Sequence, residues 1–265
     1  MFRLTREVRF AINSTADDQL AGKPTNSFGG FPSLTGLGHY FTLQATLTGP
    51  LDTTSRYLRN IKDIDTAVRL HAIPFVEHAV RAQTFGGGAN VTRGLFDLLR
   101  NRWPGAALER LSLSLTPFQS WHVLAKELPM VRLSQKFEFS ASHRLHNPSL
   151  SDDANAATYG KCNNPHGHGH NYEVQVTIAG VPDSRGVLID VPAFERTVNA
   201  AVIDRFDHKN LNVELPEFKD LIPTVENIAM TIYRLLKPRL SEAGALTLAS
   251  VTVWETPKTW CEYSE

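Results

Sequence analysis

Residues 162–174, CNNPHGHGHNYEV, place three histidines at alternate positions beside one of the two cysteines of the chain. In an extended strand, side chains two residues apart point to the same face. His166, His168 and His170 are therefore expected to line one face, provided that the strand extends back to His166. A further histidine, His143 in the segment FSASHRL, ends the strand expected before this one and can reach the same point. Three imidazoles with an open fourth position suit catalytic zinc.

The histidine cluster leaves two alternatives open. The histidines can belong to a loop that binds no metal, although the alternate spacing together with a third histidine on a neighbouring strand favours a metal site. Four histidines also compete for three ligand positions, because His166 shares the face of His168 and His170 if the strand includes it.

Cys162 lies a few residues before these histidines, in a turn-forming NNP segment. Backbone dipoles and a nearby metal would favour its thiolate, so that the side chain can act as a base or a nucleophile. A lone cysteine is most often structural, but the adjacent histidine cluster favours the functional interpretation here. Cys261 lies in a predicted terminal strand, and we expect it to have a structural role.

Two further polar sites stand where a helix and a strand are expected to end. Asp207 and His208, in FDHKNLN, directly follow a predicted helix, and a loop Asp–His pair can orient an imidazole for proton transfer. The more frequent role of such a dipeptide is a hydrogen bond at a helix end. Glu255, in VTVWETP, ends a strand, where a carboxylate can accept two parallel N–H bonds from a guanidine-like ring edge. The alternative for Glu255 is a solvated acid.

The composition is that of an ordinary globular protein. Hydrophobic residues make up 42% of the 265 residues, which is enough for a buried core. Lys plus Arg and Asp plus Glu both number 27, so no global basic field favours nucleic acid or membrane, and a small-molecule partner is the better expectation. The chain has no signal-peptide core and no run of about 18 apolar residues, so we expect a cytoplasmic protein with reduced cysteines.

The chain contains an internal repeat. GLGHYFTLQATLTG (residues 36–49) aligns without a gap with GHGHNYEVQVTIAG (residues 167–180), matching both Gly-x-Gly positions, the next histidine, a glutamine, a threonine and the closing glycine. The segments that follow also correspond, YLRNIKDIDTAV with VLIDVPAFERTV and GGANVTRGLFDLLR with PTVENIAMTIYRLLK. We therefore expect two domains, 1–128 and 129–265.

The second half is predicted to be an α+β domain. VRLSQKFEFSAS and NYEVQVTIAG alternate apolar and polar residues like half-buried antiparallel strands. VPAFERTVNAAVIDRF and TVENIAMTIYRLLKPRL have helical spacing, and ALTLASVTVWET returns to a strand, followed by a short strand in TWCEYSE. The predicted order is β-β-α-α-β, an antiparallel sheet with helices on one face. Such a sheet has two exposed edges, which oligomerisation into a β-barrel would remove.

Six motifs in order, FSASHRL, YGKCNNPHGHGHNYEV, GVLIDV, FDHKNLN, PTVEN and VWET, resemble over residues 131–265 the family of 6-pyruvoyl tetrahydropterin synthase and 6-carboxytetrahydropterin synthase, which has the tunnelling fold (T-fold). The resemblance implies Zn²⁺ as the cofactor, a pterin substrate and a homo-oligomer. The roles that it implies are zinc ligands for His143, His168 and His170, catalytic proton acceptor for Cys162, second proton-transfer unit for Asp207 and His208, anchor of the pterin ring for Glu255, and contacts near the pterin pocket for Thr224 and Glu226.

The activity implied by the resemblance is that of a zinc-dependent lyase on 7,8-dihydroneopterin triphosphate. The product is either 6-carboxytetrahydropterin, on the queuosine and deazaguanine pathway, or 6-pyruvoyl tetrahydropterin, and triphosphate is lost without net redox change. The site residues are shared by both outcomes, and we take the carboxylated product as the first expectation. The alternative is a non-catalytic pterin-binding or structural zinc protein, for which Cys162, Asp207, His208 and Glu255 would not all be needed.

The first half departs from this pattern at the ligand positions. Leu37 stands in place of His168, His39 alone matches a ligand, and Ser14 falls opposite His143. No cysteine precedes Gly36, and the segment LSLTPF has no glutamate opposite Glu255. We expect a degenerate, non-catalytic T-fold copy that is retained for assembly, in preference to a second active site.

Overall fold

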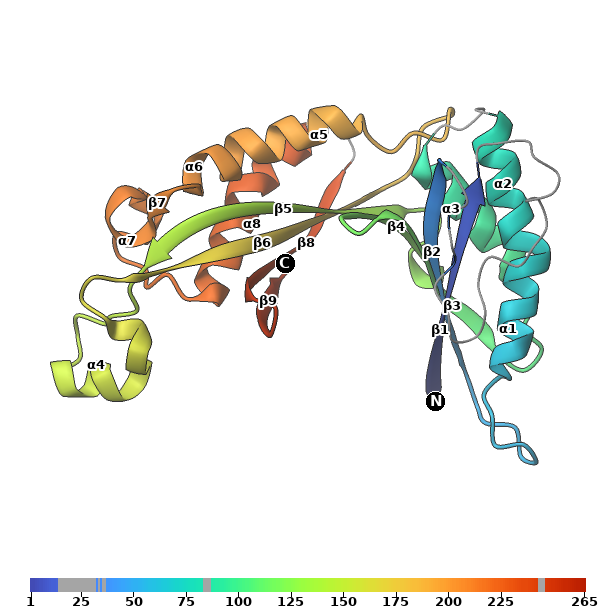
Figure 1. Ribbon diagram of the computed structural model, residues 1–265, viewed down its shortest axis with the longest axis horizontal. Coiled ribbons are helices and arrows are strands. Elements are labelled where there is room, and N and C mark those ends of the chain that lie inside the picture. Colours follow the sequence, from blue (N-terminus) through green and yellow to red (C-terminus); the bar gives the residue numbers. More distant parts are fainter. Residues whose placement is uncertain (14–31, 33, 35–36, 83–86, 243–245) are drawn as a thin grey trace. The chain divides into compact units, whose positions relative to one another are not determined.

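The computed structural model describes residues 1–13, 32, 34, 37–82, 87–242 and 246–265. The chain divides into two compact units (Figure 1). The first contains Met1–Leu133 and Gly180–Leu188, and the second contains Ser134–Ala179 and Ile189–Glu265. Each unit is built on an antiparallel sheet.

The sheet of the second unit confirms the predicted strands. Its strands follow the order β5-β6-β8-β9, and a two-residue strand, β7, pairs parallel with β5 through Ala141 and Lys209. Strand β6 begins at His168, so the strand does not extend back to His166. The bounds are β5 (Val131–His143), β6 (His168–Gly180), β7 (Lys209–Asn210), β8 (Thr247–Thr256) and β9 (Thr259–Tyr263).

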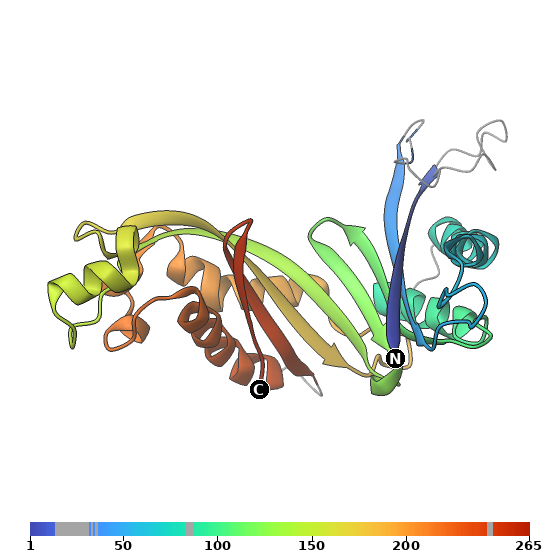
Figure 2. The same ribbon diagram turned by 90° about the horizontal axis from the view of Figure 1, so that it is seen from below.

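The helices of the second unit gather on one side of its strands (Figure 2). Both predicted helices are present, and the first is one run in which a π-helical turn, Asn199–Ile203, joins α5 to α6. Helix α8 begins directly after Pro223 and Thr224, two residue types that are common at the start of a helix. The bounds are α4 (Asp152–Tyr159), α5 (Val191–Val198), α6 (Asp204–Phe206), α7 (Leu211–Glu214) and α8 (Val225–Glu242), with 3-10 turns at Gly160–Asn163 and Pro216–Phe218.

The alternation of β6 builds the core of the second unit. Tyr172, Val174 and Val176 are fully buried on the side of the helices, while the residues between them are partly exposed. The ring of Phe139 on β5 stacks on Tyr172 at 5.0 Å and meets Phe206 of α6 edge-on at 5.5 Å. This aromatic stack fixes the spacing of β5 and β6 next to the histidines at their ends.

The first unit shares with the second the order of two strands, two helical runs and two strands, and the second has α4, β7 and α7 in addition. Its strands follow the order β1-β2-β3-β4, and its first helical run likewise contains a π-helical turn, Val68–Ala72. Register shifts occur in corresponding strand pairs, at Thr46/Leu47 in the first unit and at Thr177/Ile178 in the second. The bounds are β1 (Phe2–Asn13), β2 (Gly38–Gly49), α1 (Ile61–Ala67), α2 (Ile73–Ala82), α3 (Gly88–Leu99), β3 (Ala107–Thr116) and β4 (Gln119–Leu124), with a 3-10 turn at Ala125–Glu127.

Among the described helices, none combines the length and the apolar character that crossing a bilayer requires.

Candidate metal centre and its surroundings

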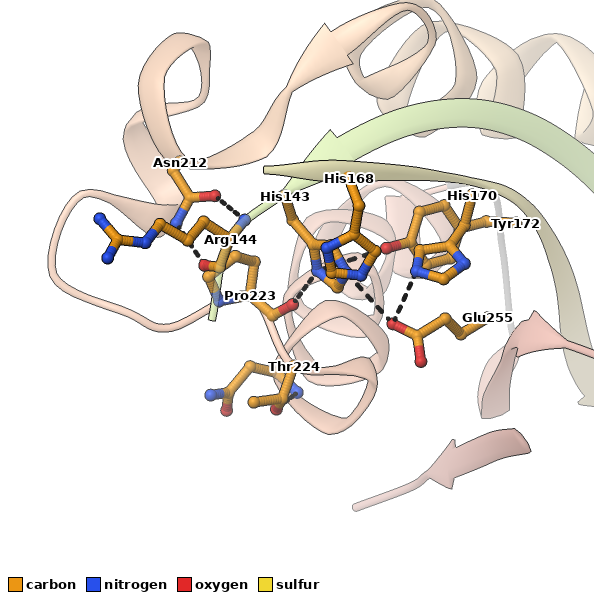
Figure 3. A network of polar contacts seen from close by, with 10 residues as sticks. His143, Arg144, His168, His170, Tyr172, Asn212, Pro223, Thr224 and Glu255 are labelled. Carbon is orange, nitrogen blue, oxygen red and sulfur yellow. Dashed lines mark hydrogen bonds and ion pairs between the residues drawn. The ribbon is translucent and has the colours of Figure 1, made fainter. Parts of the chain in front are cut away.

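Three histidines converge at the ends of β5 and β6 (Figure 3). His143 is the last residue of β5, and His168 and His170 occupy alternate positions on β6, as the spacing predicts. Their ligand atoms all lie within 4.8 Å of one another, and Nε2 of His143 is 3.1 Å from Nε2 of His168. His166 lies in the exposed turn before β6 and is outside this group. The geometry therefore selects three of the four candidate histidines.

The imidazole of His143 is oriented by the backbone. Its Nδ1 lies 2.7 Å from the carbonyl oxygen of Pro223, so Nδ1–H donates there and Nε2 faces the other two histidines. The hydroxyl of the buried Tyr172 lies 3.4 Å from the same Nδ1. This arrangement is that of a metal ligand whose second nitrogen is held by a carbonyl group.

Two nitrogens of the cluster are buried without a hydrogen-bond partner in the described part of the chain, Nδ1 of His168 and Nε2 of His170. A buried polar atom left unpaired costs about 1–3 kcal/mol. A cation bound by Nε2 of His170 and its two neighbours would satisfy that atom. Three imidazole donors with room for a further ligand match the preferences of catalytic zinc, so the residues present fit this ion.

Glu255, near the end of β8, faces the same cluster. Its Oε1 lies 3.4 Å from Nε2 of His143 and 3.7 Å from Nε2 of His170, and its side chain is 19% exposed. The carboxylate therefore borders the open side of the three histidines. There it can accept N–H groups from a bound molecule.

Burial favours the neutral form of His143 and of His170. It lowers the pKa of His143 to about 4, with the hydrogen bond to Pro223 acting in the opposite direction, and it lowers the pKa of His170 against the negative charge of Glu255. Burial also raises the pKa of Tyr172, and the charges of Glu255 and Cys162 add to this effect. Neutral imidazoles are the form that binds a metal, so burial prepares His143 and His170 for that role.

We expect the metal-free protein to lose stability as the pH falls from about 6.5 to about 4. The pKa of His143 is about 4 in the folded state and about 6.5 in the unfolded state, so the unfolded chain binds more protons between these values. The contribution of His143 to stability is then greatest above pH 6.5, and about 3 kcal/mol of it is lost on reaching pH 4. Urea unfolding at pH 7, 6 and 5 measures this slope.

The pH series has two controls. His143→Gln should make the slope between pH 6.5 and 5 shallower, while the buried His122, whose pKa is lowered to about 3, and His170, whose pKa is also lowered, keep part of it. His78→Gln removes an exposed histidine of α2 and should leave the slope unchanged. Equal slopes in the wild type and His143→Gln would contradict the role given to His143.

Cys162 lies in the 3-10 turn that follows α4, and its side chain is partly exposed. Its carbonyl oxygen accepts a hydrogen bond from the N–H of Leu145 at 2.9 Å, two residues after His143. This bond ties the cysteine turn to the end of β5. The backbone at Cys162 therefore lies near His143, the last residue of β5.

Asp207 and His208 form an ordered pair beside β5. The carboxylate of Asp207 accepts a hydrogen bond from the backbone N–H of Ser140 at 2.8 Å, and its Oδ2 lies 2.8 Å from Nδ1 of His208. Both contacts lower the pKa of Asp207, and the bond from Ser140 has the larger effect. His208 has a left-handed backbone (φ 57°) and a side chain that is 82% exposed. It lines a hollow of about 530 Å³ that His170 also borders. The pair can therefore reach a molecule bound in that hollow.

Thr224 and Glu226 stand at the start of α8. Thr224 directly follows Pro223, the partner of His143, and its hydroxyl accepts from the N–H of Asn227 at 3.4 Å. Glu226 is exposed in the first turn. Sequence reasoning missed Pro223 and Tyr172, although both belong to the motifs PTVEN and GHGHNYEV.

The counterparts in the first unit do not form a similar site. Leu37 is 87% exposed, His39 is exposed, and Ser14 lies outside the described residues. Within the residues that the structure covers, the only group of His, Cys, Asp and Glu side chains arranged for a metal is that of His143, His168 and His170.

The family model described as 6-pyruvoyl tetrahydropterin synthase matches residues 132–265. The chain belongs to this family. It is 38% identical over 136 residues to the 6-pyruvoyl tetrahydrobiopterin synthase of Drosophila melanogaster, which covers 51% of this chain and 80% of that protein. It is 28% identical over 153 residues to the 6-carboxy-5,6,7,8-tetrahydropterin synthase of Haemophilus influenzae, covering 51% of this chain and all of that protein (100%).

One solved structure resembles this chain over its whole length. The crystal structure of uricase from Arthrobacter globiformis matches with a TM-score of 0.52 at 7% identity, covering 100% of this chain and 93% of that chain. At this identity the likeness concerns the fold alone.

Proposed function

We propose that the second unit is a zinc-dependent lyase that acts on 7,8-dihydroneopterin triphosphate and releases triphosphate. The observation that carries the proposal is the convergence of His143, His168 and His170 within 4.8 Å, with the carboxylate of Glu255 3.4 Å from His143. Membership of a pterin synthase family supports the choice of substrate.

His143, His168 and His170 would hold the zinc ion. When bound, Zn²⁺ supplies a Lewis acid that polarises the hydroxyl groups of the substrate side chain. The ring edge of the pterin donates two N–H groups to Glu255, as a carboxylate with two acceptor oxygens allows. Thr224 and Glu226, at the start of α8, complete this pocket.

Proton transfer is assigned to two groups of this chain. The thiolate of Cys162 accepts a proton from a carbon of the substrate side chain. His208 moves a second proton, and Asp207 holds its imidazole through the 2.8 Å contact at Nδ1.

For the product we favour 6-pyruvoyl tetrahydropterin, the precursor in tetrahydrobiopterin synthesis, over our first expectation. The relative that carries the pyruvoyl name is 38% identical over 136 residues, against 28% over 153 residues for the carboxy-named one. The 6-carboxytetrahydropterin of the queuosine pathway is the second candidate, because the assigned residues serve both.

The test is incubation of the zinc-loaded protein with 7,8-dihydroneopterin triphosphate, followed by mass spectrometry of the pterin products. Release of triphosphate with a pyruvoyl product supports the proposal, and a carboxylated product selects the second candidate. Absence of triphosphate release at full zinc occupancy would refute the lyase and leave a pterin-binding or structural zinc protein.

We assign the first unit, near residues 1–128, to assembly as a degenerate T-fold copy. Its support is the shared order of strands and helices, together with the exposed Leu37 and His39 where the second unit has ligands. Each sheet taken by itself has edge strands, which a homo-oligomeric β-barrel of such units would pair.

A chain shortened to residues 129–265 is therefore expected to form a different oligomer, to be less soluble and to turn over poorly, although it keeps every assigned catalytic residue. Unpaired sheet edges are the physical reason. Light scattering and the turnover assay on both chains measure the effect. A shortened chain that assembles cleanly and works as well as the full one would show that the first unit is dispensable.

A further inference from the structure

The segment that leads into α8 holds the backbone group on which His143 depends. The carbonyl oxygen of Pro223 accepts Nδ1–H of His143 at 2.7 Å, and Pro223 is buried. Because Nδ1 carries the proton, the lone pair of Nε2 is left to face His168 and His170. The position of the Pro223 carbonyl group thus decides both the tautomer and the orientation of the His143 imidazole.

The Asn227 side chain fixes the peptide next to that carbonyl. Its Nδ2 donates to the carbonyl oxygen of Ile222 at 2.9 Å, and the N–H of Thr224 donates to the same oxygen at 2.8 Å. The N–H of Asn227 in turn donates to the hydroxyl of Thr224 at 3.4 Å. Pro223 has no N–H of its own and a fixed φ, so these bonds on either side hold its carbonyl group in place.

We propose that Asn227 is a positioning residue for the metal ligand His143. Its amide closes the Ile222–Thr224 turn and so presents the Pro223 carbonyl to Nδ1 of His143. The inference rests on the proposed zinc site of this unit, and it gives the motif PTVEN a role at the metal in addition to its place near the pterin. The hydrogen bonds of Asn227 described above go to Ile222 and Thr224 and not to the three histidines, so it acts on the metal site through His143.

The decisive comparison uses Asn227→Asp and Asn227→Leu. Aspartate keeps the size of the side chain but cannot donate to Ile222, and its charge repels that carbonyl; leucine removes the bond without adding a charge. Zinc affinity is measured by competition with a chromophoric chelator, and the absorption spectrum of the Co²⁺-substituted protein reports the ligand geometry. We expect about 10- to 100-fold weaker zinc binding in both variants and an altered Co²⁺ spectrum.

A matched control separates this role from general destabilisation. Asn101→Asp makes the same substitution at an exposed position of the first unit and should bind zinc like the wild type. Zinc affinity within threefold of the wild type in both Asn227 variants would overturn the proposal.

Nitrogen NMR of His143 in the metal-free wild type gives a measurement that needs no variant to fold. A proton on Nδ1 supports the proposal, and a proton on Nε2 overturns it. Neither readout involves turnover. A wild-type protein that binds zinc but leaves dihydroneopterin triphosphate intact would therefore refute the proposed lyase, while the affinities of the Asn227 variants would still decide the present inference.

Discussion

Replacing Cys162 by alanine is expected to lower turnover by about two to four orders of magnitude, the range for loss of a general base. Zinc content and pterin binding should persist, because the thiol is assigned to proton transfer and the metal to three histidines. The 3-10 turn should also persist, since it is tied to β5 through the backbone carbonyl of Cys162 and not through its sulfur. Initial rates, metal analysis and pterin titration of the variant measure the three quantities.

Cys261→Ala is the matched control for this experiment. Cys261 lies in β9, and both burial and the charge of Glu226 raise the pKa of its thiol, so little of it is present as thiolate near neutral pH. Its replacement should leave turnover close to that of the wild type. Near wild-type activity in Cys162→Ala would remove that residue from the mechanism.

One zinc ion per chain is expected, and His168→Ala should lose it together with measurable turnover. Two imidazoles cannot replace a three-histidine site, and the described residues of the first unit offer no second group of ligands. Metal analysis of the purified proteins gives the stoichiometry. Bound zinc should also decrease as the pH falls, because protons compete for the same nitrogens.

His166→Ala provides the control for the metal experiment. This histidine is two residues from His168 in sequence but lies in the exposed turn, so its replacement should leave one zinc in place. Two equivalents of zinc that both survive His168→Ala would contradict the assignment of a single site.

The exclusion of His166 marks a limit of sequence reasoning. The alternate spacing correctly placed His168 and His170 on one face, and it extended equally well to His166. Gly167 decides the matter, because its backbone is left-handed (φ 73°) and a Cβ there would lie 3.0 Å from the carbonyl oxygen of His143. Glycine permits that conformation but does not require it, so the start of the strand could not be predicted.

The partners of the site were harder to predict than its ligands. His143 and Pro223 are 80 residues apart, and the contact is made by a backbone carbonyl that every residue type possesses. Helix α4 was also missed, since its segment DDANAATY has no apolar face to signal a helix. By contrast, the strands and the two long helices of the second unit were predictable, because their apolar residues recur with the period of each structure.

The left-handed backbone of His208 has a consequence for how this family can change over time. A residue other than glycine in that conformation costs on the order of 1 kcal/mol, which glycine would not incur. Under the proposed function, the imidazole of His208 is kept at this cost because it takes part in proton transfer. Among descendants of this chain, a glycine at position 208 would mark a lineage that had kept the architecture and abandoned the reaction.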